Sequence, residues 1–294
     1  MTVIVAALGW SWQEAEVDPL TGAVTAHRRD RGPSQSELAA LEHALRLASR
    51  WDARVIAATV GPGQADAMLR DALAVGAAEA LRVDSGGGAG GPRPADLVGG
   101  AHEPAAALAA ALRQRYGVPD LVICGDRSAD RGTGSFPAFL AAALGAAQAL
   151  GVVRMEPEDG GALRVHRRLD GGRREVLLVR RPAVVSVEAA GLRLRRAGLP
   201  AVLASEDAVI PVAPPQAATA VRRVRVLGAH PYRPRPRELP GPSGSALHRT
   251  LELAGALAPR SPPTVLGPLP AGQAARELLA YLRRWGYLGT GDAE

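Results

Sequence analysis

The chain has 294 residues, enough for one large α/β domain with an appendage or for two small domains. All 35 basic side chains are arginine, since the sequence contains no lysine, and they outnumber the 29 acidic ones. Because arginine stays charged at physiological pH, the high isoelectric point alone does not indicate a nucleic-acid partner. The single cysteine, Cys124, excludes a disulfide framework and a cysteine-cluster metal site.

Membrane insertion and secretion are not expected from the sequence. The longest uncharged run, residues 133–153, holds glutamine, proline and interrupting glycines and is too weakly hydrophobic for a membrane span. The first residues carry no basic group ahead of their apolar stretch, unlike a secretory signal. We therefore expect a soluble, cytoplasmic protein.

Positive charge is concentrated in one part of the sequence. Residues 154–249 hold 18 arginines against 9 acidic residues. This excess is either a solvated arginine-rich face or a docking surface for an acidic partner. Nucleic acid is disfavoured as the partner, because stacking aromatic residues are not interleaved with the basic ones.

Strands and helices alternate through the first half of the chain, which requires right-handed crossovers and a parallel sheet. In such a sheet ligands bind beyond the carboxyl ends of the strands. The loops after Ala7, Val60 and Cys124 should therefore converge on one edge. The expected strands are 3–8, 54–60, 80–83 and 121–124, and the expected helices are one capped by Ser34 or Ser36, 64–75, 103–116 and 136–144.

The middle of the chain predicts a β-hairpin insertion near 163–180. Two strand-like runs flank Asp170-Gly171-Gly172, a turn signal, and residues 183–188 predict a further strand. We assign residues 1–212 to the α/β domain on this basis.

Residues 213–294 predict an extended arm. The chain is proline-rich and irregular to Pro270, apart from a short helix at 246–257. The last element, 273–285, is an amphipathic helix. An apolar helix at the end of a long arm is expected to dock on its own domain or on a partner chain.

Most of the chemical motifs carry little weight. Residues 86–91 match G-x-G-x-x-G, but a proline follows where a dinucleotide fingerprint needs a helix, so a low-complexity loop is the better interpretation. The six histidines lack metal-ligand spacing. Neither a nucleophile with its base nor a carboxylate pair stands out, so an acid–base or nucleophilic enzyme has no support.

The informative segment is residues 125–135, GDRSADRGTGS, between a buried strand and a helix. Gly125 permits a sharp turn beside a ligand. Thr133 and Ser135 offer hydroxyls and Gly134 an open N–H just before the helix, whose N-terminus suits a phosphate. Arg127 could add a charged donor. An ordinary helix capped by threonine or serine explains the same residues equally well.

Several segments resemble the beta subunit of electron transfer flavoproteins, in that family's order. They are VGPGQADAMLRDALAVGAAEALRVD at 60–84, PDLVICGDRSADRGTGSFPAFLAAALG at 119–145, the stretch around 168–187, GLPAVLAS at 198–205, and the closing helix AARELLAYLRRWG. The resemblance covers nearly the whole chain. It implies a parallel-sheet nucleotide-binding domain, Rossmann-like and adenine nucleotide alpha hydrolase-like, with an extended C-terminal arm.

The resemblance implies an electron carrier subunit rather than an enzyme. Such beta subunits pair with an alpha subunit, bury AMP and help hold an FAD at the interface, and they carry electrons from dehydrogenases to an acceptor. Bifurcating relatives hold a second FAD in place of AMP. Matched residue by residue, the nucleotide contacts fall on Ala6, Pro33, Ser34, Gln35, Ser36, Val60, Gly125, Arg127, Ser128, Asp130, Thr133, Gly134 and Ser135. The partner-recognition leucine matches Leu199, near Arg195 and Arg196.

The chain departs from the family pattern at several of these positions. Asp126-Arg127 replaces Lys-Gln, Ser135 replaces Gln, and Leu192 to Arg196 replaces Asn-Glu-Pro-Arg-Tyr. Asp126 is unfavourable near a phosphate unless it points away or Arg127 neutralises it. These departures identify a divergent paralogue, for which a mycofactocin-associated branch is one candidate. The alternative is a stand-alone adenine-nucleotide-binding regulatory module of the universal-stress-protein type, which would not need the arm. A nucleotide-hydrolysing or ligase enzyme has no catalytic set behind it.

Overall fold

Residues 2–13, 16–18, 24–25, 31–85, 101–130, 132–189, 191–214, 241–257, 265–285 and 287 are described by the computed structural model. The chain divides into two units, Met1–Arg233 and Pro234–Glu294. The glycine-rich run at 86–91 and much of the proline-rich arm lie outside the described residues. The domain boundary expected at residue 212 stays a prediction.

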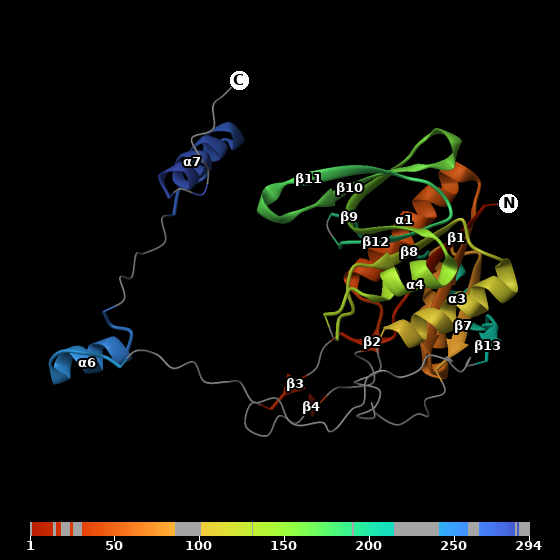
Figure 1. The fold of residues 1–294 in the computed structure, drawn as a ribbon, viewed down its shortest axis with the longest axis horizontal. Coiled ribbons are helices and arrows are strands. Elements are labelled where there is room, and N and C mark those ends of the chain that lie inside the picture. The colour runs from red at the N-terminus through yellow and green to blue at the C-terminus, as the bar shows by residue number, and fades with distance from the viewer. Residues whose placement is uncertain are drawn as a thin grey trace. The chain divides into compact units, whose positions relative to one another are not determined.

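A nine-stranded sheet forms the centre of the first unit (Figure 1). Its spatial order is β11-β10-β9-β12-β8-β1-β6-β7-β13, and only the β9–β10 and β10–β11 pairs are antiparallel. The α/β fold with a mostly parallel sheet is therefore confirmed. The strands are β1 (Val3–Ala7), β6 (Arg54–Gly61), β7 (Glu79–Asp84), β8 (Leu121–Gly125), β9 (Ala147–Pro157), β10 (Leu163–Arg168), β11 (Arg174–Val179), β12 (Ala183–Val187) and β13 (Val212–Ala213).

Helices cover both faces of this sheet, with α3 and α4 on one face and α1 on the other (Figure 1). In β1, Ile4 packs with the apolar side chains of α1 and α2, whereas Val5 packs with those of α3 and α4. Burial on both faces explains why the central strands are continuous apolar runs. The helices of this unit are α1 (Gln35–Trp51), α2 (Asp66–Ala74), α3 (His102–Tyr116), α4 (Phe136–Leu144) and α5 (Leu199–Glu206).

The predicted hairpin forms as β10 and β11, joined at Asp170–Gly172 with Gly171 at φ 70°. The run at 133–153 divides into α4, a turn at Gly145 with φ 64°, and the start of β9. β9 runs parallel to β12 and antiparallel to β10. It therefore connects the parallel part of the sheet to the hairpin.

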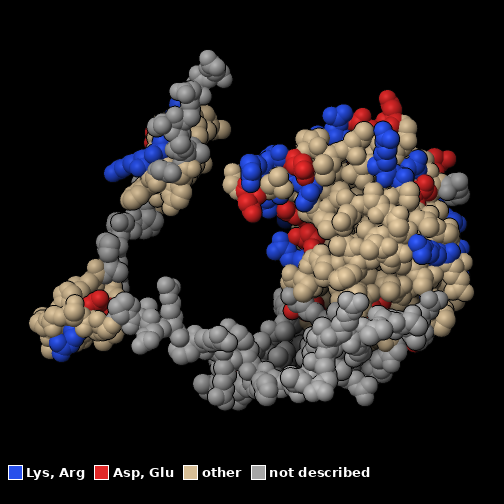
Figure 2. All heavy atoms as spheres, in the orientation of Figure 1, with Lys and Arg blue, Asp and Glu red and all other residues tan. Residues whose placement is uncertain are grey.

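Much of the arginine excess in the hairpin region is paired with acidic side chains. Arg167 lies 2.9 Å from Glu175, Arg168 lies 2.7 Å from Glu188, and Arg164 pairs with Glu158. Figure 2 shows basic and acidic side chains interspersed over this end of the sheet. For these residues a solvated, ion-paired face is the better interpretation of the charge excess.

Several elements were not predicted. β13 pairs with β7 through Val212 and Arg82, where the sequence predicted irregular chain. Leu199–Glu206 forms α5, and the strand pairs β2 (Ser11–Trp12) with β5 (Arg31–Gly32) and β3 (Glu16–Val17) with β4 (Val24–Thr25) also form. Strands of two residues are too short to show alternation, so no periodic signal reveals them.

The second unit contains α6 (Ala246–Leu253) and α7 (Ala271–Arg284). Ser245 caps α6 by accepting the N–H of His248 at 3.2 Å. α6 is shorter than the predicted 246–257, because Gly255 takes φ 66° just beyond its end. No residue of α7 is buried. None of the helices in the described ranges is both long and apolar enough to cross a bilayer.

Candidate functional site

The loops that follow β1, β6 and β8 meet at one edge of the sheet, as predicted. β1 lies between β6 and β8, and all three run parallel, so their carboxyl ends are neighbours. The N–H of Leu8 donates to the carbonyl of Ala58 at 2.8 Å and ties the first loop to β6. Of the predicted nucleotide contacts, Ala6 is a fully buried residue within β1 and Val60 is half-buried near the end of β6.

The predicted contacts at 33–36 form the start of α1, and Ser34 is its N-cap. The Ser34 hydroxyl accepts the Glu37 N–H at 3.3 Å, and the Glu37 carboxylate accepts the Ser34 N–H at 2.6 Å. Ser36 and Ser34 are buried, with their hydroxyls 3.1 Å apart. Ser34 and Glu37 thus form a reciprocal capping box, and the Ser36 hydroxyl contacts that of Ser34. Gln35 is exposed and Pro33 half-buried.

The sequence patterns did not single out Glu37, whose carboxylate contacts both the N-cap of α1 and the loop after β1. Its carboxylate also accepts the Gly9 backbone N–H, and a Cβ on Gly9 would lie 2.5 Å from its Oε1. Desolvation raises the pKa of Glu37 to about 7 against the lowering effect of the Ser34 hydrogen bonds, and Asp130 adds repulsion. The serine-to-glutamate spacing of a capping box was the signal that could have identified it.

Gly125 brings the end of β8 against the first turn of α1. A Cβ at this position would lie 2.6 Å from Ser36 Oγ and 2.8 Å from Glu37 Cγ. Only a residue without a side chain allows this approach. The glycine that the sequence predicted to face a ligand therefore also has a packing role.

The loop after Gly125 folds back on itself. The Ser128 N–H donates to the Thr133 carbonyl at 3.0 Å, and their hydroxyl oxygens lie 3.3 Å apart. A Cβ on Gly134 would lie 2.7 Å from the Asp126 carbonyl oxygen. The loop thus brings Ser128, Thr133 and Gly134 together, with Asp130 exposed at its tip.

Asp126 is neutralised by its neighbour. The Arg127 guanidinium lies 2.9 Å from the Asp126 carboxylate, whose side chain is 14% exposed, whereas the arginine side chain is 66% exposed. This pairing satisfies the condition that the sequence analysis set for a phosphate beside Asp126.

The start of α4 is uncapped, unlike that of α1. Ser135 is the N-cap residue of α4, yet its side chain accepts no helix N–H. Thr133, Gly134 and Ser135 are all exposed in front of the helix. The exposed hydroxyls and the positive end of the helix dipole suit an anion here, and Phe136 and Ala138 carry N–H groups in the first turn whereas Pro137 does not. The ordinary-cap interpretation of Ser135 is wrong.

The predicted partner-docking residues differ from one another. Leu199 is 70% exposed, and Val202 and Leu203 beside it on α5 are 42% and 58% exposed. Arg196 is exposed as well. Arg195, in contrast, is held by a carboxylate within the chain.

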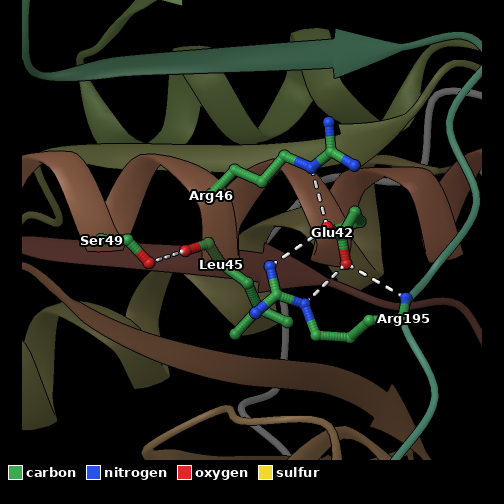
Figure 3. Close-up of polar contacts among 5 residues, drawn as sticks. All are labelled: Glu42, Leu45, Arg46, Ser49 and Arg195. Carbon is green, nitrogen blue, oxygen red and sulfur yellow. Dashed lines mark hydrogen bonds and ion pairs between the residues drawn. The ribbon is translucent and has the colours of Figure 1, made fainter.

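Arg195 binds Glu42 of α1 through its backbone N–H and its guanidinium (Figure 3). The Glu42 carboxylate accepts Arg195 Nε at 2.9 Å and Arg46 Nε at 2.8 Å, and its side chain is 4% exposed. Burial alone would raise the pKa of Glu42, but these hydrogen bonds outweigh it and lower the pKa to about 2. Sequence reasoning had no signal for this pair, whose members are 153 positions apart.

The described residues include no group of three or more histidine, cysteine or acidic side chains that could hold a metal ion. Cys124 is buried at the end of β8, where burial raises the pKa of its thiol. It is a core residue rather than a reactive group.

Comparison with known proteins identifies related sequences. Residues 21–218 match the family described as Electron transfer flavoprotein domain. "Protein FixA" of Azorhizobium caulinodans is 29% identical over 191 residues, which is 63% of this chain and 65% of that protein. "Electron transfer flavoprotein subunit beta" of Thermoanaerobacterium thermosaccharolyticum is 32% identical over 177 residues, 59% of this chain and 62% of that protein. The chain therefore spans less than two thirds of the length of either relative.

Proposed function

Because the chain belongs to the electron transfer flavoprotein domain family, we propose that it is the beta-type subunit of a cytoplasmic electron-carrying heterodimer that binds AMP. In this proposal the partner is an alpha subunit, an FAD lies at the interface, and dehydrogenases are the electron donors. The flavin supplies the redox chemistry when bound, whereas this chain positions nucleotides and partners. The relative named as a beta subunit supports the assignment.

The uncapped start of α4 is the observation that carries AMP binding. A phosphate there would receive hydroxyl donors from Thr133 and Ser135 and N–H donors from the first turn other than Pro137, which has none, with Arg127 in the same loop. Ser34 cannot take this role without breaking its capping box with Glu37, and the Ser36 hydroxyl is buried against that of Ser34. A second FAD would present phosphates to the same groups, so the experiment below distinguishes AMP from FAD.

Loss of the two hydroxyls tests the site. Each hydrogen bond to a charged group contributes about 1.5–3 kcal/mol, so Thr133→Ala with Ser135→Ala should release the nucleotide from the purified heterodimer. Mass spectrometry of the denatured protein measures AMP and FAD content. Ser49→Ala on α1, where the hydroxyl bonds only the Leu45 carbonyl at 3.1 Å, is the control. Full nucleotide content in the double variant would refute the loop assignment, and FAD in place of AMP would support a bifurcating type.

In this proposal the alpha subunit covers the apolar side chains of α7 and of Trp285 directly after it. Leu278, Tyr281 and Trp285 are 59%, 52% and 61% exposed. We expect the chain purified alone to be colourless and the co-expressed heterodimer to be yellow, as an absorption spectrum would show. A stable, nucleotide-loaded monomer that does not bind an alpha subunit would instead favour the stand-alone regulatory module.

Leu199 is the proposed anchor for the electron donor. An exposed apolar side chain can fill a partner pocket and set residence time, while charges around it mainly speed encounter. Leu199→Ala should slow electron transfer from the dehydrogenase and leave FAD content and melting temperature unchanged. Arg196→Glu should weaken association most at low salt. A lower melting temperature with an unaltered transfer rate would make Leu199 a packing residue.

A further inference from the structure

An arginine-walled groove lies outside the candidate nucleotide site. It has a volume of about 500 Å³ and lies between α1, β9 and the segment that precedes α5. Four arginines line it: Arg46 and Arg50 of α1, Arg154 of β9, and Arg195. They come from three parts of the sequence, so the groove is a product of the fold.

The four cations are only partly neutralised. Glu42 binds Arg46 and Arg195, and Glu156 pairs with Arg154. Two carboxylates therefore face four guanidinium groups, and Arg50 has no ion pair among the described residues. Burial and the neighbouring Arg46 lower the pKa of the lining His43 to about 4, so it adds no charge at neutral pH.

The guanidinium groups remain accessible to a partner. The side chains of Arg46, Arg154 and Arg195 are 60%, 68% and 43% exposed. Only one nitrogen of Arg46 is bonded to Glu42, so its other N–H groups can donate elsewhere. Figure 3 shows the Arg46 guanidinium extending past Glu42 with its two terminal nitrogens free of dashed contacts.

The floor between these cations is aliphatic. Leu47, Met155 and Leu192 line the groove, and none of its lining residues is Phe, Tyr or Trp. Nucleotide bases and single-stranded nucleic acids are generally held by stacking on aromatic side chains. The aliphatic side chains and the arginines of the groove are together complementary to a peptide that carries both aliphatic side chains and carboxylates.

The geometry points to the groove between α1 and β9 as a docking site for an acidic, aliphatic segment of a partner protein. Arg195 lines the groove and precedes Leu199, the first residue of α5, by four positions in the sequence. This inference does not depend on nucleotide or flavin binding by the chain.

Binding of a labelled peptide to the full chain tests the inference. The probe is a short fluorescein-labelled peptide of alternating glutamate and leucine, and the reference probes are its glutamine–leucine counterpart, ATP and an oligothymidylate. The double variant Arg50→Glu with Arg154→Glu should bind the glutamate–leucine peptide about tenfold or more weakly than the wild type does. The matched control, Arg113→Glu with Arg174→Glu, makes the same charge change at exposed arginines outside the groove and should weaken it less than about twofold.

The outcomes are distinct. Fluorescence anisotropy should show binding that falls as salt rises from about 0.05 to about 0.3 M, and melting curves should show that both variants fold. An equal loss of peptide affinity in the two double variants would mean that net charge alone governs binding, and would overturn the inference. Tighter binding of ATP or the oligothymidylate than of the peptide would overturn the inference and indicate a phosphate ligand instead. Absence of binding by the glutamate–leucine peptide would overturn it as well.

Discussion

α1 and α4 both begin at the carboxyl edge of the same parallel sheet, yet their first turns are built differently. α1 has a complete capping box from Ser34 and Glu37, and its serine hydroxyls are buried. α4 begins at an exposed serine that caps nothing. The Ser34 hydroxyl accepts an N–H of the first turn of α1, whereas Ser135 accepts none from α4, whose second residue, Pro137, has no N–H.

The difference separates a structural role, for α1, from the binding role that we propose for α4 at the same edge. The first turn of α1 packs directly against Gly125, the residue from which the loop after β8 begins. α4 supplies the donors that an anion would use. The family resemblance predicts nucleotide contacts at the start of α1 and at the start of α4. In the structure, the hydroxyls that are free to bind a ligand lie mainly at the start of α4.

The largest expected effect concerns the proton on Glu37. Its pKa is raised from 4.5 to about 7 in the folded protein, so the folded state holds a proton that the unfolded chain has released. The contribution of Glu37 to the free energy of unfolding should therefore fall as pH rises from about 4.5 to about 7, by about 3 kcal/mol at 1.36 kcal/mol per pKa unit, and then level off. Glu37→Gln, which preserves the capping pattern, should remove this dependence.

A second group acts in the opposite direction within this window. His43, with its pKa lowered from 6.5 to about 4, makes the free energy of unfolding rise as pH increases from about 4 to about 6.5. The decisive measurement is thus the difference between wild type and Glu37→Gln in urea melts across the pH range. A difference that does not vary with pH would place Glu37 in contact with solvent.

The next effect concerns the contact between β8 and α1. Gly125→Ala should lower the free energy of unfolding by about 2 kcal/mol, because the new methyl group overlaps Ser36 and Glu37. Gly32→Ala is the control, since a Cβ there meets nothing within 4 Å. Denaturant unfolding of both variants gives the comparison. Equal free energies of unfolding for Gly125→Ala and Gly32→Ala would mean that α1 can shift to make room for the added methyl group.

The smallest effects compare the two helix starts directly. Ser34→Ala should lower stability by about 1 kcal/mol through loss of the α1 cap. Ser135→Ala should change stability by less than about 0.5 kcal/mol, because its hydroxyl caps nothing, while weakening nucleotide binding. Calorimetric melting and nucleotide titration distinguish the two. If Ser135→Ala were as destabilising as Ser34→Ala, the contrast between the helices would be lost.

Local patterns predicted the parts of the fold that are buried on both faces or capped locally. The apolar strands β1, β6 and β8 were visible as runs, and Ser34 was one of two proposed caps. β13 was not predictable, because two residues carry no periodicity and their pairing with β7 depends on tertiary structure.

The site was predictable to the same limited extent. The glycines and hydroxyls of the loop after β8 could be placed at a helix start from their order alone. That α4 lacks a cap, and that Arg195 is held by Glu42, depends on side-chain orientation and on a contact between distant segments. A pattern of residue types contains neither.

The position of β12 has a consequence for biosynthesis. It lies between β8 and β9, both of which precede it in the chain, so the sheet keeps an open slot until Ala183–Val187 have been made. A nascent chain that ends earlier leaves the facing edges of β8 and β9 without a partner strand. The complete sheet of the first unit therefore cannot form before β12 has been synthesised, and until then the two unpaired strand edges are open to incorrect pairing.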